Sequence, residues 1–196
     1  YHEEAASRAA LLADVAHRAL GALGARPASA AVGPPLAPPE RHVHEMVCEW
    51  AARTPDAPAL VDGATALSYA ELAADARLLA CWLVAAGARP RTVVGCLMEH
   101  RSEAVVAQLA AGLSGAAFFG METHFGPKML AELLEQSRPV ALLASAATRA
   151  RAEGALPTTT ALLDVDAGWR EAAAAAAAAV APPEAWARAA PYDGGI

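Results

Sequence analysis

Apolar residues follow two different spacings along the middle of the chain. Runs of continuous apolar residues at strand length alternate with longer segments in which large apolar residues recur every three or four positions. Strands this apolar are typical of parallel sheets that helices cover on both faces, so the pattern predicts a doubly wound, mainly parallel α/β sheet. The predicted strands are 92–98, 116–119, 140–144 and 160–166, and the predicted helices are 69–86, 102–113 and 127–136.

Before this alternation the sequence predicts a helix and a small hairpin. Apolar residues at helical spacing favour a helix over Val43–Arg53, which a Thr-Pro-Asp turn signal ends. Two short extended pieces flank Gly63, at 59–62 and 66–68, and predict a hairpin. Ser68 and Glu71 have the spacing of a capping box at the start of the next helix.

Four regions divide the chain. Residues 1–23 have the apolar spacing of one amphipathic helix, and 24–41 form a Pro/Ala-rich linker with too few large apolar residues to fold. Residues 42–167 hold the α/β pattern. In 168–196 an alanine run predicts a surface helix or frayed insertion, followed by an irregular tail. The start at Tyr1 suggests a cut inside a longer chain, and Ile196 suggests an incomplete end.

The composition limits the classes of partner and the cellular location that can be expected. The formal net charge is −6 and no Lys/Arg cluster occurs, so nucleic acid is not expected as a partner. Apart from alanine-dominated runs the chain has no apolar stretch of membrane-spanning length, and no membrane association is expected. Its three cysteines, Cys48, Cys81 and Cys96, fit neither a disulfide framework nor a zinc site. They predict buried thiols and a cytoplasmic protein.

The polar residues with catalytic potential have ordinary structural explanations. His44 to Cys48 begins like a zinc-protease helix but lacks the second histidine, so no metal ligand is assigned, and His42 and His44 are expected to be exposed. Glu122 and His124 follow a predicted strand, where open α/β sheets bind ligands, and the charged turn 99–103 follows the preceding strand. Solvated turns explain both groups, so the sequence assigns no catalytic, cofactor-binding or metal-binding residue.

Two motifs carry a resemblance to a known family. The hexapeptide Leu67 to Leu72 matches an L-T/S-Y-x-E-L core motif at Leu67, Ser68, Tyr69, Glu71 and Leu72. A second motif, Lys-Ala-Gly-x-Ala-Tyr-Val-Pro-Leu-Asp-Pro, is matched loosely by Gly115 and Ala117, while its Pro-Leu-Asp-Pro end has become Gly120 to Thr123. In this order, the motifs resemble the opening of the adenylation domains of nonribosomal peptide synthetases. These domains belong to the superfamily of adenylate-forming, AMP-dependent synthetases and ligases.

The resemblance implies a partial adenylate-forming domain in 42–167, with residues 1–23 similar to the last helix of a condensation domain. In that family the complete enzyme uses ATP and Mg to activate an amino or carboxylic acid, then transfers it to phosphopantetheine on a carrier protein. Partners would be the remainder of the adenylation domain and neighbouring condensation and carrier domains.

The family's Ser/Thr/Gly-rich phosphate loop ending in Lys has no match from Val43 to Ile196, so the chain alone is expected to be inactive. Two alternatives stay open. The first is a fragment of an acyl-CoA ligase, which is built on the same elements. The second is a non-catalytic scaffold or interaction remnant.

Overall fold

The computed structural model describes residues 42–63 and 65–179. The predicted helix over 1–23 and the linker over 24–41 lie outside these residues, and so does the irregular tail predicted over 182–196.

The first elements are a helix, a hairpin and a second helix. Helix α2 spans Val43–Arg53, strands β1 (Pro58–Asp62) and β2 (Thr65–Ser68) pair in antiparallel fashion, and helix α3 spans Tyr69–Ala85. Gly63 takes a positive φ of 58° in the turn, a conformation that glycine adopts without strain. The predicted helix, hairpin and following helix are all confirmed within a residue or two at each end.

Four parallel strands form the central sheet. Strands β3 (Val93–Leu97), β4 (Ala117–Gly120), β5 (Ala141–Ala144) and β6 (Ala161–Asp164) lie in the order β4-β3-β5-β6. All three strand pairs are parallel. Every residue of β5 is buried, as expected for a strand covered on both faces. The parallel sheet predicted from the apolar runs is confirmed.

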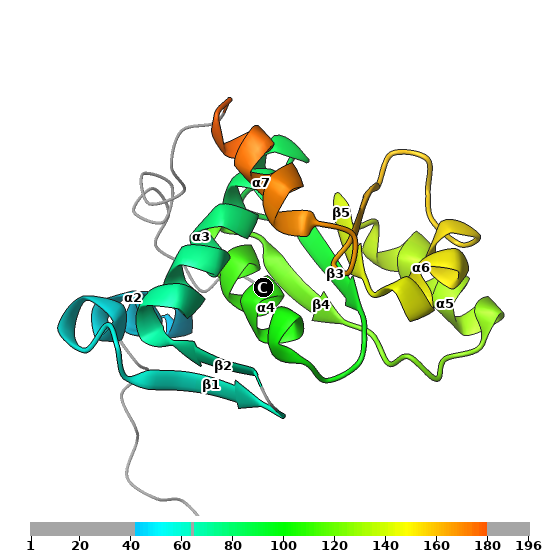
Figure 1. Cartoon of the computed structure of the whole chain (residues 1–196). Coiled ribbons are helices and arrows are strands. Elements are labelled where there is room, and N and C mark those ends of the chain that lie inside the picture. Colours follow the sequence, from blue (N-terminus) through cyan, green and yellow to red (C-terminus); the bar gives the residue numbers. More distant parts are fainter. Residues whose placement is uncertain (1–41, 64, 180–196) are drawn as a thin grey trace, which may run out of the picture. The chain divides into compact units, whose positions relative to one another are not determined.

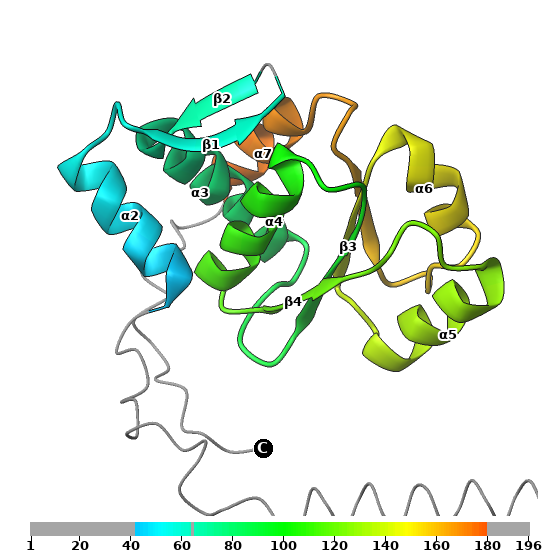
Figure 2. The same ribbon diagram turned by 90° about the horizontal axis from the view of Figure 1, so that it is seen from below.

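Helices cover both faces of the sheet. Helices α3, α4 (Ser102–Leu113) and α7 (Trp169–Ala177) lie on one face, and α5 (Pro127–Ser137) and α6 (Ala146–Glu153) lie on the other (Figures 1 and 2). Two apolar clusters fill the spaces between the layers. The first packs α3, α4 and α7 on the sheet, and the second packs α5 and α6 on the opposite face. This is the doubly wound arrangement that the alternation predicted.

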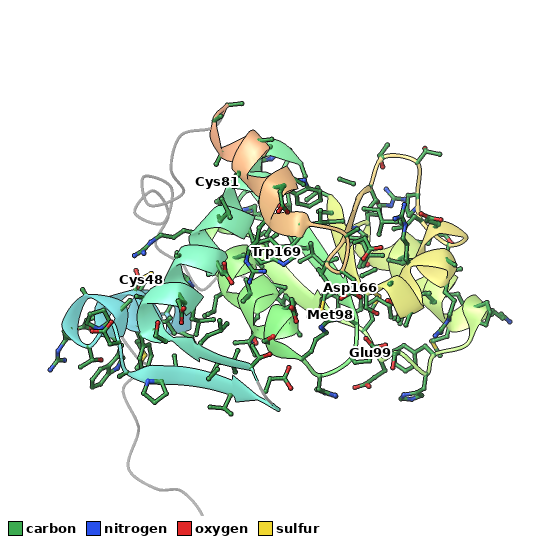
Figure 3. The ribbon with its side chains drawn as sticks, viewed as in Figure 1. Cys48, Cys81, Met98, Glu99, Asp166 and Trp169 are labelled. Carbon is green, nitrogen blue, oxygen red and sulfur yellow. The ribbon has the colours of Figure 1, made fainter. Side chains whose placement is uncertain are left out.

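Helix α7 is a surface helix, which was one of the two predicted alternatives for the alanine run. One of its faces packs along α3, with Trp169 and Ala173 as its only buried residues. Trp169 and Ala173, one turn apart, are 3% and 0% exposed, and Trp169 points into the molecule in Figure 3. The Arg170 guanidinium also donates a hydrogen bond from its Nε to the Asp75 carboxylate of α3, at 3.0 Å. One tryptophan at the start of the run supplies the apolar anchor that alanines lack, and the small alanines allow the two helices to approach closely.

Helix α6 is not predicted by the hydrophobic pattern. Its residues include no large apolar side chain, and only Thr148 and Ala152 are buried. Polar contacts hold it instead, because the buried Thr148 hydroxyl donates a hydrogen bond to the Leu97 carbonyl oxygen at 2.5 Å. The Arg151 guanidinium donates to the carbonyl oxygens of Thr123 and Phe125. Hydrogen bonds between distant segments leave no periodic signal in the sequence.

Helix α2 packs against α4 with the His44 ring next to Gly112. A Cβ placed on Gly112 would lie 2.5 Å from the His44 Nδ1 atom, so the imidazole ring occupies the space that a side chain at 112 would need. His44 is therefore half-buried, which corrects the prediction that it is exposed. Burial, and then the neighbouring His42, lower the pKa of His44. His42 itself is exposed, as predicted.

The three cysteines are free thiols. Cys81 and Cys96 are buried, as predicted, and burial raises the pKa of Cys96 to about 12. Cys48 is only half-buried, because it lies on α2 at the side of the core (Figure 3). At neutral pH the Cys96 thiol stays protonated, which is consistent with a packing role.

Candidate site at the carboxyl edge of the sheet

The carboxyl edge of the sheet is where an open α/β protein places its ligands. Strands β3 and β5 are neighbours whose following helices, α4 and α6, lie on opposite faces, so the loops after them diverge. This point is the topological switch of the sheet. The candidate residues that follow β3 and β4 in the sequence all lie along this edge.

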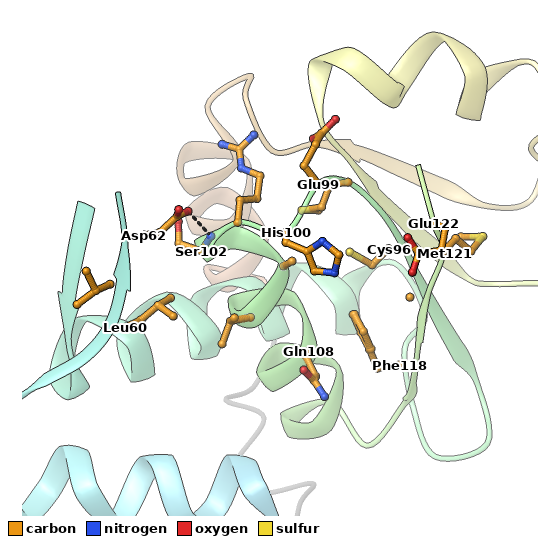
Figure 4. A pocket seen from close by; sticks show the side chains of 16 residues that line it. Leu60, Asp62, Cys96, Glu99, His100, Ser102, Gln108, Phe118, Met121 and Glu122 are labelled. Atoms are coloured by element: carbon orange, nitrogen blue, oxygen red, sulfur yellow. Dashed lines mark hydrogen bonds between the residues drawn. The ribbon is translucent and has the colours of Figure 1, made fainter. Parts of the chain in front are cut away.

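A hollow of about 470 Å³ opens beside the switch point. The hairpin forms one wall, the first turns of α4 form the base, and the ends of β3 and β4 form the other wall (Figure 4). Glu99, His100, Arg101 and Glu122 line it, so the structure gathers four of the weighed candidates around one space. Its apolar lining includes Leu60, Met98, Phe118 and Met121.

His124, which does not line the hollow, makes an ordinary surface contact. His124 and Glu122 face each other at 3.8 Å between Nδ1 and Oε2, with side chains 77% and 57% exposed. An exposed pair at this distance contributes little energy. Among the residues that the structure describes, no group of three or more His, Cys, Asp or Glu side chains could hold a metal ion.

At the switch point, Asp166 connects three loops. It follows β6, pairs with Arg101 after β3 and accepts a hydrogen bond from Ala146 after β5. The Arg101 guanidinium lies 2.8 Å from an oxygen of Asp166, which follows β6, and 2.7 Å from an oxygen of Glu103. Hydrogen bonds to Glu103 raise the pKa of Arg101. The Ala146 N–H, and then Arg101, lower the pKa of Asp166 although burial opposes this. For Glu103, burial alone would raise the pKa, but hydrogen bonds from Arg101, its own backbone and Ser102 lower it on balance.

Two carboxylates outside the helices cap the helix N-termini at this edge. The Ser102 N–H at the start of α4 donates a 2.9 Å hydrogen bond to Asp62 of the hairpin. The Ala146 N–H at the start of α6 donates a 2.8 Å hydrogen bond to Asp166. Sequence reasoning missed both, because their partners lie 40 and 20 residues away. The only signal was an acidic residue at the end of a strand, for Asp62, or two residues past one, for Asp166.

The first core-motif residues lie at the junction of the hairpin and α3. Ser68 is the N-cap of α3, and its N–H donates to the Glu71 carboxylate at 2.8 Å while its hydroxyl accepts from the Glu71 N–H at 3.3 Å. The predicted capping box is confirmed. Leu67 is the last-but-one residue of β2, Leu72 is buried in the core and Tyr69 stacks on Trp50 of α2.

The second group of motif residues lies elsewhere. Gly115 is in the turn before β4 with a φ of 77°, and a Cβ there would lie 3.2 Å from the Pro90 ring. Ala117 begins β4 and is exposed. The structure does not join these two residues to the hexapeptide in one site. Each group shapes a turn or a helix start, and no side chain among them lines the hollow.

Comparison with known proteins gives the family. The sequence profile of the family described as "AMP-binding enzyme" matches residues 47–192, which include α7 and most of α2. The chain belongs to this family. Its match covers well over half of the sequence and extends through all of the sheet.

The relatives are nonribosomal peptide synthetases. The chain is 38% identical over 125 residues to the probable non-canonical nonribosomal peptide synthetase CymA of Salinispora arenicola. It is 35% identical over 115 residues to nonribosomal peptide synthetase 8 of Aspergillus fumigatus. These matches cover 63% and 59% of this chain but only 2% and 1% of those proteins, so the chain spans a very small part of the relatives' length.

A solved structure gives the same result. The nonribosomal peptide synthetase FmoA3, in its alpha-methyl-L-serine-AMP-bound form, is 31% identical with a TM-score of 0.61, over 67% of this chain and 15% of that one. Together with the family match, these likenesses identify the chain as part of an AMP-binding domain similar to the adenylation domains of peptide synthetases. In the part of the chain that the structure describes, no helix is both long and apolar enough to cross a membrane.

Proposed function

We propose that the chain is the N-terminal part of an ATP-dependent adenylating domain that activates an amino acid in an enzyme of the nonribosomal-peptide-synthetase type. The observation that carries this proposal is the family match over 47–192 together with relatives that are themselves peptide synthetases. The strand order of the sheet and the structural similarity to FmoA3 are consistent with this proposal.

The proposed reaction of the complete domain joins a carboxylate oxygen to the α-phosphorus of ATP. The bond to pyrophosphate breaks, and an acyl adenylate forms. The acyl group then passes to a carrier-bound phosphopantetheine thiol and AMP leaves. Partners of this part of the domain are accordingly the rest of the adenylation domain and neighbouring condensation and carrier domains. A cytoplasmic location for the complete enzyme stays a prediction from cysteine usage.

The described residues do not fit the phosphates of ATP with Mg. The helix N-termini of α4 and α6, which could bind phosphate, already bind Asp62 and Asp166. Lys128 is the only lysine of the sequence, and its side chain is 94% exposed beside Glu132, away from any glycine-rich loop. Residues beyond those described would have to supply phosphate binding. We therefore expect no adenylation by this chain alone.

The native transcript tests this proposal. Its in-frame translation past Ile196 should contain a Ser/Thr/Gly-rich loop closed by Lys, followed by a carrier domain. A loop of this kind without a carrier domain would favour the acyl-CoA ligase alternative. A stop codon directly after Ile196 would contradict an adenylating function and favour the scaffold alternative.

A further inference from the structure

The carboxyl edge of the sheet exposes helix N-termini, which are the usual phosphate sites of α/β proteins. Unpaired backbone N–H groups and the helix dipole attract anions there. Helices α4 and α6 both begin at this edge, one on each side of the switch point. The N-cap of α4, Arg101, accepts no hydrogen bond from the helix backbone through its side chain. At the start of α6, Ser145 and Thr148 form a capping box, which leaves the Ala146 N–H to another partner.

We propose that Asp62 and Asp166 are built-in anions that fill these two N-termini and exclude phosphate from this edge. Each carboxylate accepts a hydrogen bond from the first N–H of its helix, Ser102 for Asp62 and Ala146 for Asp166. Each comes from another element, Asp62 from the end of β1 and Asp166 from the loop after β6. The carboxylates therefore occupy the position that a phosphate oxygen would take.

Neighbouring charged side chains stabilise the Asp166 carboxylate at the N-terminus of α6. Its second oxygen forms a 2.8 Å ion pair with Arg101, and Arg101 also donates to Glu103 at 2.7 Å. The nearest guanidinium is thus already shared by two acids and offers little to an incoming anion. A phosphate would have to displace a carboxylate whose pKa is held below its usual value by the same contacts.

A third helix on this edge is also a poor phosphate site. Helix α5 starts with Pro127, which has no N–H to donate at the first helical position. Other acids along the edge add to the repulsion, because Glu99 and Glu122 line the adjacent hollow. Glu99 and Glu122 therefore add negative charge beside the two filled N-termini, while Lys128 in the first turn of α5 adds positive charge.

This inference does not depend on the proposed function. The two carboxylates bind the helix N-termini regardless of which substrate the complete enzyme activates. It assigns Asp62 and Asp166 a specificity role, which keeps phosphate groups from binding at the general ligand-binding point of the fold. Nucleotide phosphates would then have to bind through other residues.

Chemical rescue by small anions tests the proposal. Removing the Asp166 carboxylate by Asp166→Ala should lower Tm by about 2–4 °C, because a charge at a helix N-terminus and its ion pair are lost. Formate or inorganic phosphate should then restore most of that loss, relative to sodium chloride at matched ionic strength. The same anions should leave the wild-type Tm unchanged. Equal effects on wild type and variant would overturn the proposal.

Matched variants separate a vacated anion site from general destabilisation. Asp166→Asn keeps an acceptor in place and leaves no space for formate, so its loss of Tm should not be rescued. Glu132→Ala removes an exposed carboxylate on α5 and should show neither loss nor rescue. Asp62→Ala repeats the test at α4 if the Asp166 variant does not fold. Rescue of Asp166→Asn to the same extent as Asp166→Ala would contradict the site.

An amide titration gives a second readout on the wild-type chain. Addition of inorganic phosphate, and separately of ATP, should cause no saturable chemical-shift change at the Ser102 and Ala146 amides. In Asp166→Ala the Ala146 amide should shift saturably with phosphate. A saturable shift of either amide in the wild type would overturn the proposal, and leave the proposed adenylating function untouched.

Discussion

Replacing Gly112 by alanine tests how closely α2 packs on α4. Glycine inside a helix is less stable than alanine by about 1 kcal/mol, so the helix alone would gain from the change. The new Cβ would however lie 2.5 Å from the His44 Nδ1 atom and 3.1 Å from its Cγ, both too close. The His44 ring would have to swing away or α2 would have to move.

Overpacking of this kind costs about 1–3 kcal/mol, so the net change for Gly112→Ala should range from near zero to a loss of about 2 kcal/mol. In a His44→Ala background the obstacle is gone and only the gain of about 1 kcal/mol remains. The two backgrounds should therefore differ by about 1–3 kcal/mol in the effect of the same substitution.

Urea unfolding followed by far-UV circular dichroism measures all four corners of this cycle. Gly154→Ala serves as the matched control, because its added Cβ meets no atom closer than 3.7 Å and its backbone is already helical. It should behave alike in both backgrounds. An effect of Gly112→Ala that does not depend on His44 would refute the proposed contact between α2 and α4.

Three further outcomes follow from single side chains. Trp169→Ala should lose about 3–5 kcal/mol of unfolding free energy, because the ring is 3% exposed against α3, while Trp50→Ala, at a ring 42% exposed, should lose clearly less in the same urea titration. Ser68→Ala should lose about 0.5–2 kcal/mol through the N-cap of α3, and Ser68→Asn, which retains a cap, should lose little; equal losses would contradict the capping role. Because the folded pKa of His44 lies below the ordinary 6.5, the unfolded chain binds its proton first, so stability holds above pH 6.5 and falls as the pH drops below it. His44→Gln should flatten that fall, and an unchanged pH profile would show that His44 is not its source.

The element order could be read from the sequence because each element had a local signal. Strand β5 is a short run of apolar residues, and α3 has both a capping box and a closing glycine. Such signals depend on neighbours within a few residues, so one sequence is enough to find them. The sheet order and register follow from packing between distant segments and needed the structure.

The features that the sequence did not predict share one physical cause, which is contact between segments far apart in the chain. Helix α7 is anchored on α3 by Trp169 and by the Arg170–Asp75 pair, 95 residues apart. The half-burial of His44 depends on a glycine in another helix. No local pattern reports either contact.

The sequence indicated where a ligand site would lie, after the strands of the sheet, but assigned no residue to it. Glu99, His100, Arg101 and Glu122 do line a hollow at the carboxyl edge, where residues that follow strands are expected. The two carboxylates that cap α4 and α6 were missed, because a cap supplied from a distant element leaves no motif. The family itself could be inferred from the hexapeptide, although its residues shape a helix start rather than the site.

Amino-acid-dependent ATP–pyrophosphate exchange is the most direct test of the central claim. The protein translated from the complete native transcript should catalyse exchange with one or a few amino acids. The 196-residue chain alone should not exceed background. Exchange by the short chain would contradict our assignment of phosphate binding to other residues. A complete protein that forms acyl-CoA thioesters from fatty or aryl acids, and shows no exchange with any amino acid, would contradict the peptide-synthetase assignment.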